Sequence, residues 1–282
     1  MHVTFQELGR RGRLGNQLFQ IATTIGIARR NRCKFIFPKW KYSHFFAHPL
    51  PQADEVTFEQ TYYEQHFCYY PVEIQTSANL SGYFQSEKYF KECEDEIRRY
   101  FTPNEKLAAM VAEEQEFLSA QVDVGKTCSV CVRRGDYVGN GYFQELAKTS
   151  YYVNAFRQFD PQTEFLVFSD EIDWCRTYFK QECYRPYRFT FANPVHKLSG
   201  LFLMASCRNH IIANSTYPWW GAWLNSSKNK RVIAPDTWFD GFITTQGKAY
   251  TEGGFHDTKD LIPESWEKIP VHFGELSGVP HV

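Results

Sequence analysis

Apolar strand patterns alternate with helical patterns through the second half of the chain, and this alternation constrains the fold more than any other sequence feature. Short runs rich in Val, Ile and Phe are each followed by a segment whose apolar residues recur at helical spacing. The expected strands cover residues 127–132, 164–168, 188–191 and 210–213, and the expected helices lie near residues 150–159, 171–180, 196–207 and 218–224. The pattern predicts an α/β fold in which helices wrap a parallel sheet.

The first half of the chain opens with a strand, a glycine turn and a helix. We expect the strand at residues 3–8, the turn at 9–15 and the helix at 16–30, where apolar residues recur at spacings of three and four. Further expected elements are a strand at 35–37 and helices at 87–100 and 105–121. Residues 40–86 are rich in aromatic residues, His and Pro, and their periodicity is too weak to assign elements.

The sequence of residues 123–126 indicates a linker between two domains. We therefore predict an N-terminal domain over residues 1–122 and a C-terminal domain over residues 123–245. Residues 246–282 contain scattered Gly and Pro with little pattern, so we expect them to form a tail that packs across the surface.

Composition excludes several classes of protein. The chain has 282 residues, 43% of them hydrophobic, and no run of 18 or more apolar residues that would predict a membrane span. Its first residues lack the basic and apolar regions of a secretory signal, so we expect a soluble cytoplasmic protein, with association at the inner face of the membrane left open. With 31 basic and 32 acidic residues there is no global field to attract nucleic acid, and any anion site must be local.

Two pairs of residues have the spacing of metal ligands, but their sequence context favours a role in packing. Cys128 and Cys131 have the spacing of a zinc or redox pair, yet they fall in an expected strand, where residues three apart point to opposite faces. His44 and His48 are four apart but lack the glutamate of a zinc protease. We predict no metal site and expect all eight cysteines to be reduced thiols.

The strongest local signal is the run Arg133-Arg134-Gly135-Asp136, which directly follows an apolar strand pattern. Open α/β sheets bind ligands at the carboxyl ends of their strands, so the two arginines place positive charge at a binding edge. This arrangement suits a phosphate, although a solvated surface cluster is the plain alternative.

Three further loops are expected near the same kind of edge. They are the glycine turn at 9–15, which contains three arginines, the loop at 169–171, and the loop that begins Asn214-Ser215-Thr216 before a helix. Helix N-termini with Ser and Thr can bind anions, but for such a loop taken alone ordinary helix capping is the favoured explanation. Neither a P-loop nor a dinucleotide fingerprint is present, so a diphosphate here would be neutralised by arginines and backbone N–H groups.

Five runs together resemble the alpha-1,2-fucosyltransferases of glycosyltransferase family 11. They are GRLGNQLFQIA (12–22), VRRGDYV (132–138), FSDEIDWC (168–175), IIANSTYPWWGAWLN (211–225) and VIAPDTWF (232–239). The resemblance implies a GT-B type fold of two Rossmann-like domains with a donor-binding cleft between them, the acceptor side being N-terminal and the nucleotide-sugar side C-terminal. It also implies a metal-independent, inverting enzyme without a cofactor, which moves L-fucose from GDP-β-L-fucose to O2 of a terminal β-galactoside.

The resemblance also assigns roles to residues. It implies that Arg133 binds the donor pyrophosphate and that Ser215 or Thr216 helps, within the loop that begins at Asn214. Arg134 and Asp136 are then expected to brace each other.

From the opposite domain, Asn16 and Gln17, which follow Gly15, are expected to face the sugar. The catalytic base stays unidentified, and Asp136 is a candidate only by elimination.

One position departs from the family pattern, which usually has His where this chain has Cys131. A thiol there would remove a hydrogen-bond donor near the nucleotide, and contacts to guanine could shift to Asn193 or His196. A GT-B glycosyltransferase with another nucleotide-sugar donor therefore stays open as an alternative. A catalytically silent scaffold that binds nucleotide or carbohydrate is a second alternative, although the intact Arg133, Arg134 and Asp136 argue against it. The sequence does not identify the acceptor glycan, although we expect residues 40–86 to help select it.

Overall fold

A computed structural model describes residues 1–239, 242–244, 248–251 and 254–272. The chain forms two compact units. The first comprises Met1–Ala109 and Thr244–Pro263, and the second comprises Met110–Ile243 and Glu264–Val282. This division differs from the predicted domains, because helix α3 (Glu105–Ser119) begins in the first unit and ends in the second, and because part of the predicted tail belongs to the first unit.

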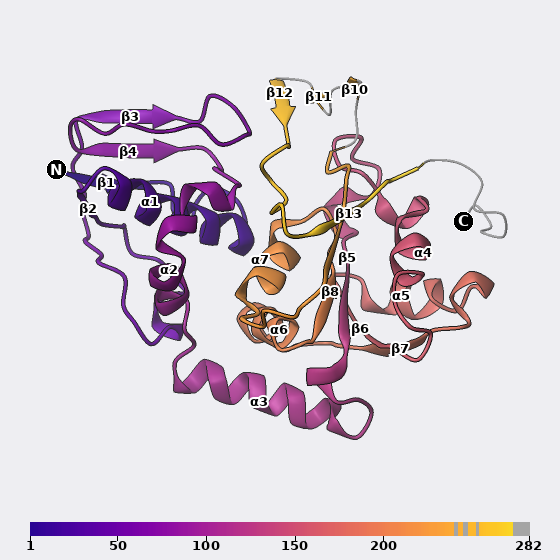
Figure 1. Ribbon diagram of the computed structural model, residues 1–282. Coiled ribbons are helices and arrows are strands. Elements are labelled where there is room, and N and C mark those ends of the chain that lie inside the picture. The colour runs from indigo at the N-terminus through magenta and orange to yellow at the C-terminus, as the bar shows by residue number, and fades with distance from the viewer. Residues whose placement is uncertain (240–241, 245–247, 252–253, 273–282) are drawn as a thin grey trace. The chain divides into compact units, whose positions relative to one another are not determined.

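The first unit contains a four-stranded parallel sheet in the order β2-β1-β4-β3 (Figure 1). Its strands are β1 (His2–Thr4), β2 (Lys34–Phe35), β3 (Gln60–Tyr63) and β4 (Ala78–Ser81). Strands thus form near the predicted ranges 3–8 and 35–37, but each begins one residue earlier and is shorter than predicted. Strands β3 and β4 lie in the aromatic segment that the sequence left unassigned.

Helix α1 (Leu14–Arg30) confirms the predicted helix and is buried along most of its length. It ends at Asn31, whose Nδ2 donates to the Ile27 carbonyl oxygen at 2.8 Å. The same carbonyl oxygen also accepts the Asn31 backbone N–H at 3.0 Å, so the side chain and the backbone of Asn31 together cap this end of the helix.

The predicted helix at 87–100 is broken. It consists of the 3₁₀ turns η2 (Glu87–Tyr89) and η3 (Lys91–Cys93) and the short helix α2 (Glu94–Tyr100), because Phe90 leaves helical geometry. The break presses the chain onto α1, where a Cβ added at Gly26 would lie 2.1 Å from the Tyr89 carbonyl oxygen. Burial of Tyr89 and Phe90 against α1 therefore overrides the local helical pattern.

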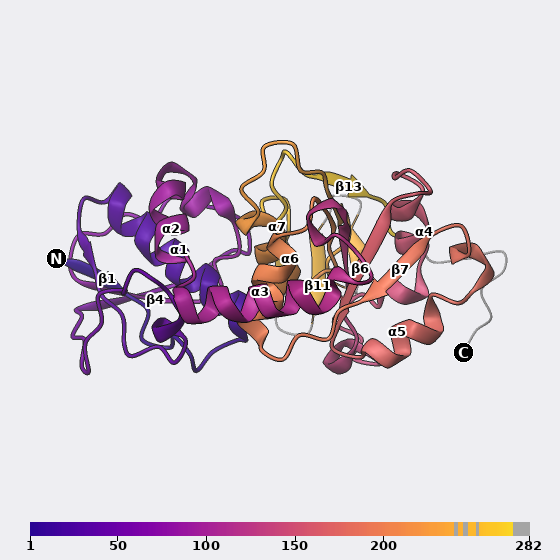
Figure 2. The same ribbon diagram turned by 90° about the horizontal axis from the view of Figure 1, so that it is seen from below.

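The second unit contains a six-stranded parallel sheet in the order β13-β9-β8-β5-β6-β7. Its strands are β5 (Cys128–Val132), β6 (Glu164–Ser169), β7 (Arg188–Phe191), β8 (Asn209–Ile211), β9 (Val232–Pro235) and β13 (Glu267–Ile269). Helices α4 (Tyr151–Phe156) and α5 (Ile172–Tyr178) lie on one face, and α6 (Lys197–Ala205) and α7 (Thr216–Leu224) lie on the other (Figures 1 and 2). Right-handed crossovers explain this placement, since the chain leaves β5 in one direction and β8 in the other. The predicted alternation is confirmed.

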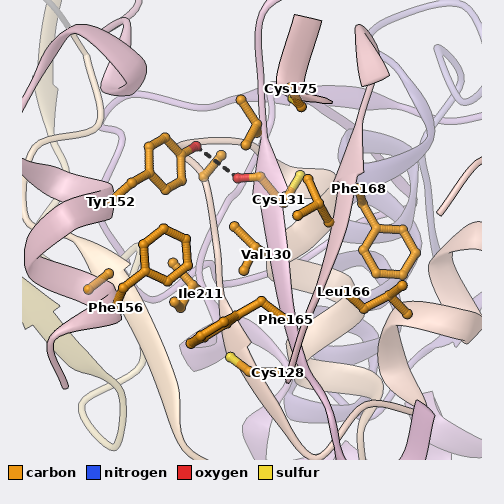
Figure 3. Packing of buried hydrophobic residues seen from close by; sticks show 14 of the residues in the cluster. Cys128, Val130, Cys131, Tyr152, Phe156, Phe165, Leu166, Phe168, Cys175 and Ile211 are labelled. Atoms are coloured by element: carbon orange, nitrogen blue, oxygen red, sulfur yellow. Dashed lines mark hydrogen bonds between the residues drawn. The ribbon is translucent and has the colours of Figure 1, made fainter. Parts of the chain in front are cut away.

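Strand β5 is central and buried on both faces, which is why its sequence reads as a continuous apolar run. Figure 3 shows Val130 packed among side chains of α4, β6 and β8, and the Tyr152 hydroxyl bonded to the Cys131 carbonyl oxygen at 2.8 Å. Cys128 and Cys131 are both buried in this strand, and all eight cysteines are free thiols.

Regular structure continues beyond Gly241, where the sequence predicted little. Strands β10 (Phe242–Thr244), β11 (Lys248–Thr251) and β12 (Gly254–Asp257) form a small sheet, in which β11 and β12 are antiparallel. Strand β13 pairs with β9 at the edge of the large sheet, so this part of the predicted surface tail is corrected to a sheet strand. The remaining elements are short 3₁₀ turns: η1 (Ser43–Phe45), η4 (Val124–Lys126), η5 (Gly135–Tyr137), η6 (Leu146–Lys148) and η7 (Glu182–Tyr184).

Candidate active site

The order of the large sheet reverses between β5 and β8. From β5 the chain continues outward through β6 and β7, whereas from β8 it continues outward through β9 to β13. Ligands of open α/β sheets bind at such a switch point, beyond the carboxyl ends of the strands. Arg133 directly follows β5, and Asn214 lies three residues after β8. The two sequence signals therefore flank the switch point.

Arg133 is held by two carboxylates. Its Nη1 pairs with Asp170 and its Nη2 pairs with Asp136, and its guanidinium lies over the Tyr137 ring, 5.0 Å from the ring centre. Asp136 comes from the same loop, whereas Asp170 follows the neighbouring strand β6. The arginine predicted to bind phosphate is therefore oriented by charges on two sides.

Arg134 is committed to different partners. Its Nε donates to the Glu171 carboxylate at 2.9 Å, and its guanidinium stacks on the Trp174 ring at 3.6 Å from the centre. The pKa of Glu171 is lowered, mainly because its carboxylate accepts a hydrogen bond from Arg134. The predicted bracing of Arg134 by Asp136 is wrong, because Asp136 pairs with Arg133 and the side chain of Arg134 extends to the β6 loop.

The backbone of this loop is also tied to the β6 loop. The N–H groups of Arg134 and Gly135 donate to Asp170 and Glu171, each at 3.0 Å. Gly135 has φ +35°, and a Cβ there would lie 2.5 Å from Asp170 Oδ2, so the position favours glycine. These two backbone donors are thus already used within the protein.

Asn214 is buried and shapes the loop after β8. Its Nδ2 donates to the carbonyl oxygens of Gln144 at 2.9 Å and Trp238 at 2.8 Å. Its own carbonyl accepts from the Tyr137 hydroxyl at 3.0 Å, so Tyr137 connects the Arg133 loop to this loop. Asn214 is therefore placed as a scaffold residue, with no side-chain donor left for a ligand.

Ser215 directly precedes helix α7 and Thr216 is its first residue, and both are half-buried. Ser215 is the N-cap residue in extended geometry, yet its side chain makes no capping hydrogen bond. Burial raises the pKa of the Tyr137 phenol, while the Arg133 charge and hydrogen bonds with Ser215 and Arg133 oppose the rise. Ser215 therefore lies beside Tyr137, whose ring contacts the Arg133 guanidinium.

Cys131 and Asn193 are placed differently from the residues that surround Arg133. The Cys131 side chain is buried in β5, and burial raises its thiol pKa, so it is neutral at physiological pH. Asn193 is exposed on the loop after β7, two strands away from β5. His196 caps α6, where its Nδ1 accepts from the Leu198 N–H at 3.2 Å.

The predicted residues of the first unit stabilise the glycine turn. Gln17 is 3% exposed, accepts from Trp40 Nε1 at 2.8 Å and donates to the Gly12 carbonyl oxygen at 3.0 Å, so its amide is committed to the turn. Asn16 accepts from Gln85 at 3.0 Å. Gly15 is buried in the first turn of α1.

Sequence reasoning missed the roles of three residues in the β6 loop and the helix after it. Helix capping is one explanation of the loop at 169–171, but α5 has Glu171 as its N-cap without a side-chain bond, and Asp170 instead binds Arg133. Glu171 and Trp174 hold Arg134. The available signal was the acidic pair at the end of a strand next to β5, since carboxyl ends of parallel strands meet at one edge.

Among the residues that the structure describes, no three His, Cys, Asp or Glu side chains are grouped so that they could hold a metal ion. Within the same ranges, no helix has both the length and the hydropathy needed to cross a membrane.

The second unit has a doubly wound parallel sheet with arginines at its switch point. Such an arrangement is typical of α/β proteins that bind phosphate-bearing ligands. The family model "Glycosyl transferase family 11" matches residues 6–253, and the chain belongs to this family of glycosyltransferases. It is 28% identical to an alpha-1,2-colitosyltransferase of Escherichia coli, over 81% of this chain and 90% of that protein.

Other relatives match over smaller shares of their length. The O-antigen biosynthesis glycosyltransferase WbnK of Escherichia coli is 34% identical over 60% of this chain and 58% of that protein. Human galactoside alpha-(1,2)-fucosyltransferase 1 is 27% identical over 76% of this chain and 63% of that protein. A solved structure of Arabidopsis thaliana FUT1 in complex with GDP matches with a TM-score of 0.52 and 10% identity, covering 94% of this chain and 76% of that one. The fold is of the GT-B type, with a parallel sheet in each unit.

Proposed function

We propose that this glycosyltransferase moves L-fucose from GDP-β-L-fucose to O2 of a terminal β-galactoside and inverts the anomeric centre. The observation that carries the proposal is Arg133, a guanidinium fixed by two carboxylates at the switch point of the sheet. Family membership and the alpha-1,2-fucosyltransferase relatives support the same reaction.

In the proposed mechanism, the bond between C1 of fucose and the diphosphate oxygen breaks while the acceptor O2 bonds to C1 from the opposite face. Negative charge grows on the departing diphosphate, and a prearranged guanidinium lowers the barrier because it needs no reorientation as the charge develops. The N-terminus of α7, beginning at Ser215 and Thr216, supplies backbone N–H groups and hydroxyls close to the same loop. The proton of the acceptor hydroxyl passes to a base that we leave unassigned.

A second donor is the main alternative. The alpha-1,2-colitosyltransferase matches over 90% of its length, a larger share than any of the fucosyltransferase relatives named above, so a colitosyl donor with the same nucleotide is the second candidate. The buried thiol of Cys131, where the family usually has His, also keeps donor choice open.

Nucleotide binding and transfer together test the proposal. We expect GDP to raise the melting temperature more than UDP or ADP, with or without Mg²⁺. Transfer from GDP-fucose and GDP-colitose to a panel of β-galactosides then identifies the donor. A preference for UDP would refute the proposal, and GDP binding without transfer from either donor would favour a silent scaffold.

The arginine assignment has its own test. Arg133→Ala is expected to lower kcat/KM by about 100-fold or more, because one preorganised donor to a developing oxyanion contributes about 3–4 kcal/mol. Arg133→Lys should recover little of this, since a point charge cannot make a bidentate phosphate contact. The matched control is Arg185→Ala, which removes an exposed arginine directly after η7 and should leave activity unchanged. Near-normal transfer by Arg133→Ala would refute the placement of the diphosphate.

A further inference from the structure

We propose that the two carboxylates on Arg133 have different functions, which nothing in the family comparison assigns. Asp170 is a positioning residue that fixes the guanidinium, and Asp136 occupies the place that a donor phosphate oxygen takes on binding. The inference rests on the proposed function, because it takes Arg133 as the diphosphate contact.

Asp170 is built into the framework of the site. One of its carboxylate oxygens pairs with Arg133 Nη1, and the other accepts the backbone N–H of Arg134 at 3.0 Å. The left-handed Gly135 leaves room for this carboxylate, since any Cβ would meet it at 2.5 Å. Asp170 thereby links the loops after β5 and β6, and a ligand could not displace it without opening the loop.

Asp136 is placed differently. It lies three residues from Arg133 in the same loop, and its side chain is 46% exposed, compared with 29% for Asp170. A half-exposed carboxylate on a guanidinium can be exchanged for another anion at little cost, because solvent stabilises the released charge. A phosphate oxygen has the same charge sign and acceptor geometry as the carboxylate oxygen that it replaces.

The two roles predict opposite effects on anion binding. If Asp170 aims the guanidinium, its loss misdirects Arg133 and weakens the binding of a diphosphate. If Asp136 occupies the phosphate position, its loss removes a competitor and a like charge, so the diphosphate binds more tightly. A purely structural carboxylate would not give this difference in sign.

GDP affinity measured by calorimetry tests the inference with a double-mutant cycle. We expect Asp170→Asn to raise the Kd for GDP by about tenfold in the wild-type background and to have no effect in the Arg133→Ala background. Asp136→Asn should lower the Kd by a few-fold. The matched control is Asp173→Asn, which removes a 97% exposed carboxylate three residues from Asp170 and should leave the Kd unchanged.

The outcomes separate the inference from the function on which it rests. If Arg133→Ala binds GDP as well as the wild type, the proposed diphosphate site fails. If that variant binds weakly while Asp170→Asn binds normally, or if the Asp170 effect persists without Arg133, the positioning role is refuted. Weaker GDP binding by Asp136→Asn would refute the exchange. The GDP affinity of Asp136→Asn can still refute the exchange if the Asp170→Asn variant does not fold.

Discussion

A buried histidine makes the stability of the second unit depend on pH. His210 in β8 is 0% exposed, its Nδ1 lies 2.8 Å from the Ser129 hydroxyl, and its Nε2 lies 2.9 Å from Asn225 Nδ2. The orientation of the Asn225 amide is fixed, since Nδ2 also donates to the Cys207 carbonyl oxygen and Oδ1 accepts from the Ser227 N–H. Nε2 must therefore accept, so the imidazole is neutral with its proton on Nδ1.

Acidification should destabilise this arrangement. Burial, and secondarily the charge of Lys230, lower the pKa of His210 from 6.5 to about 3. Because the folded pKa lies below the unfolded value, the unfolded chain binds the extra proton between these two pH values, and stability falls as pH falls through that window. From pH 7 to pH 5 the unfolded imidazole becomes charged while the folded one does not, which costs about 2 kcal/mol.

Urea unfolding at pH 7 and pH 5 measures this loss. We expect the wild type to lose about 2 kcal/mol more than His210→Gln, whose side chain does not titrate. The matched control is His48→Gln, which removes an imidazole that is exposed. Equal losses in the wild type and His210→Gln would refute the reasoning. An NMR signal for His210 that titrates near pH 6.5 in the folded protein would do so as well.

Two further substitutions test the packing. Arg134→Lys should lower the free energy of unfolding by about 1 kcal/mol, because an ammonium cannot stack flat on Trp174, and unchanged stability in urea would contradict this role. Gly26→Ala should destabilise by about 1–3 kcal/mol, because its Cβ would meet the Tyr89 carbonyl oxygen at 2.1 Å. Gly125→Ala, with a nearest contact of 3.4 Å, is the matched control, and equal melting temperatures for the two alanine variants would count against the close approach.

Local sequence pattern was sufficient for the framework of the second unit. The alternation from β5 to α7 predicted parallel strands, because buried strands read as continuous apolar runs and helices as periodic ones. It also placed Arg133 at a strand end, where the structure has it. These features depend on neighbours a few residues apart, so a single sequence carries them.

Local pattern was not sufficient where partners are distant. The helix predicted at 87–100 breaks at Phe90 because burial against α1 outweighs the helical pattern. Strands β3 and β4 have no alternating pattern, and β13 joins the large sheet only through pairing with β9. Each is stabilised by contacts with residues far away in sequence, which a local window does not include.

The same distinction between local sequence pattern and contacts with distant residues applies to the candidate active site. The sequence by itself determined that arginines follow β5 and that Asn-Ser-Thr precedes a helix after β8. Only the tertiary structure decided which carboxylate each arginine meets: Arg133 pairs with Asp170, 37 residues away, and Arg134 with Glu171. The physical reason is that parallel strands bring their carboxyl ends to one edge, so the charges that orient a side chain come from the neighbouring strand as well as from its own loop.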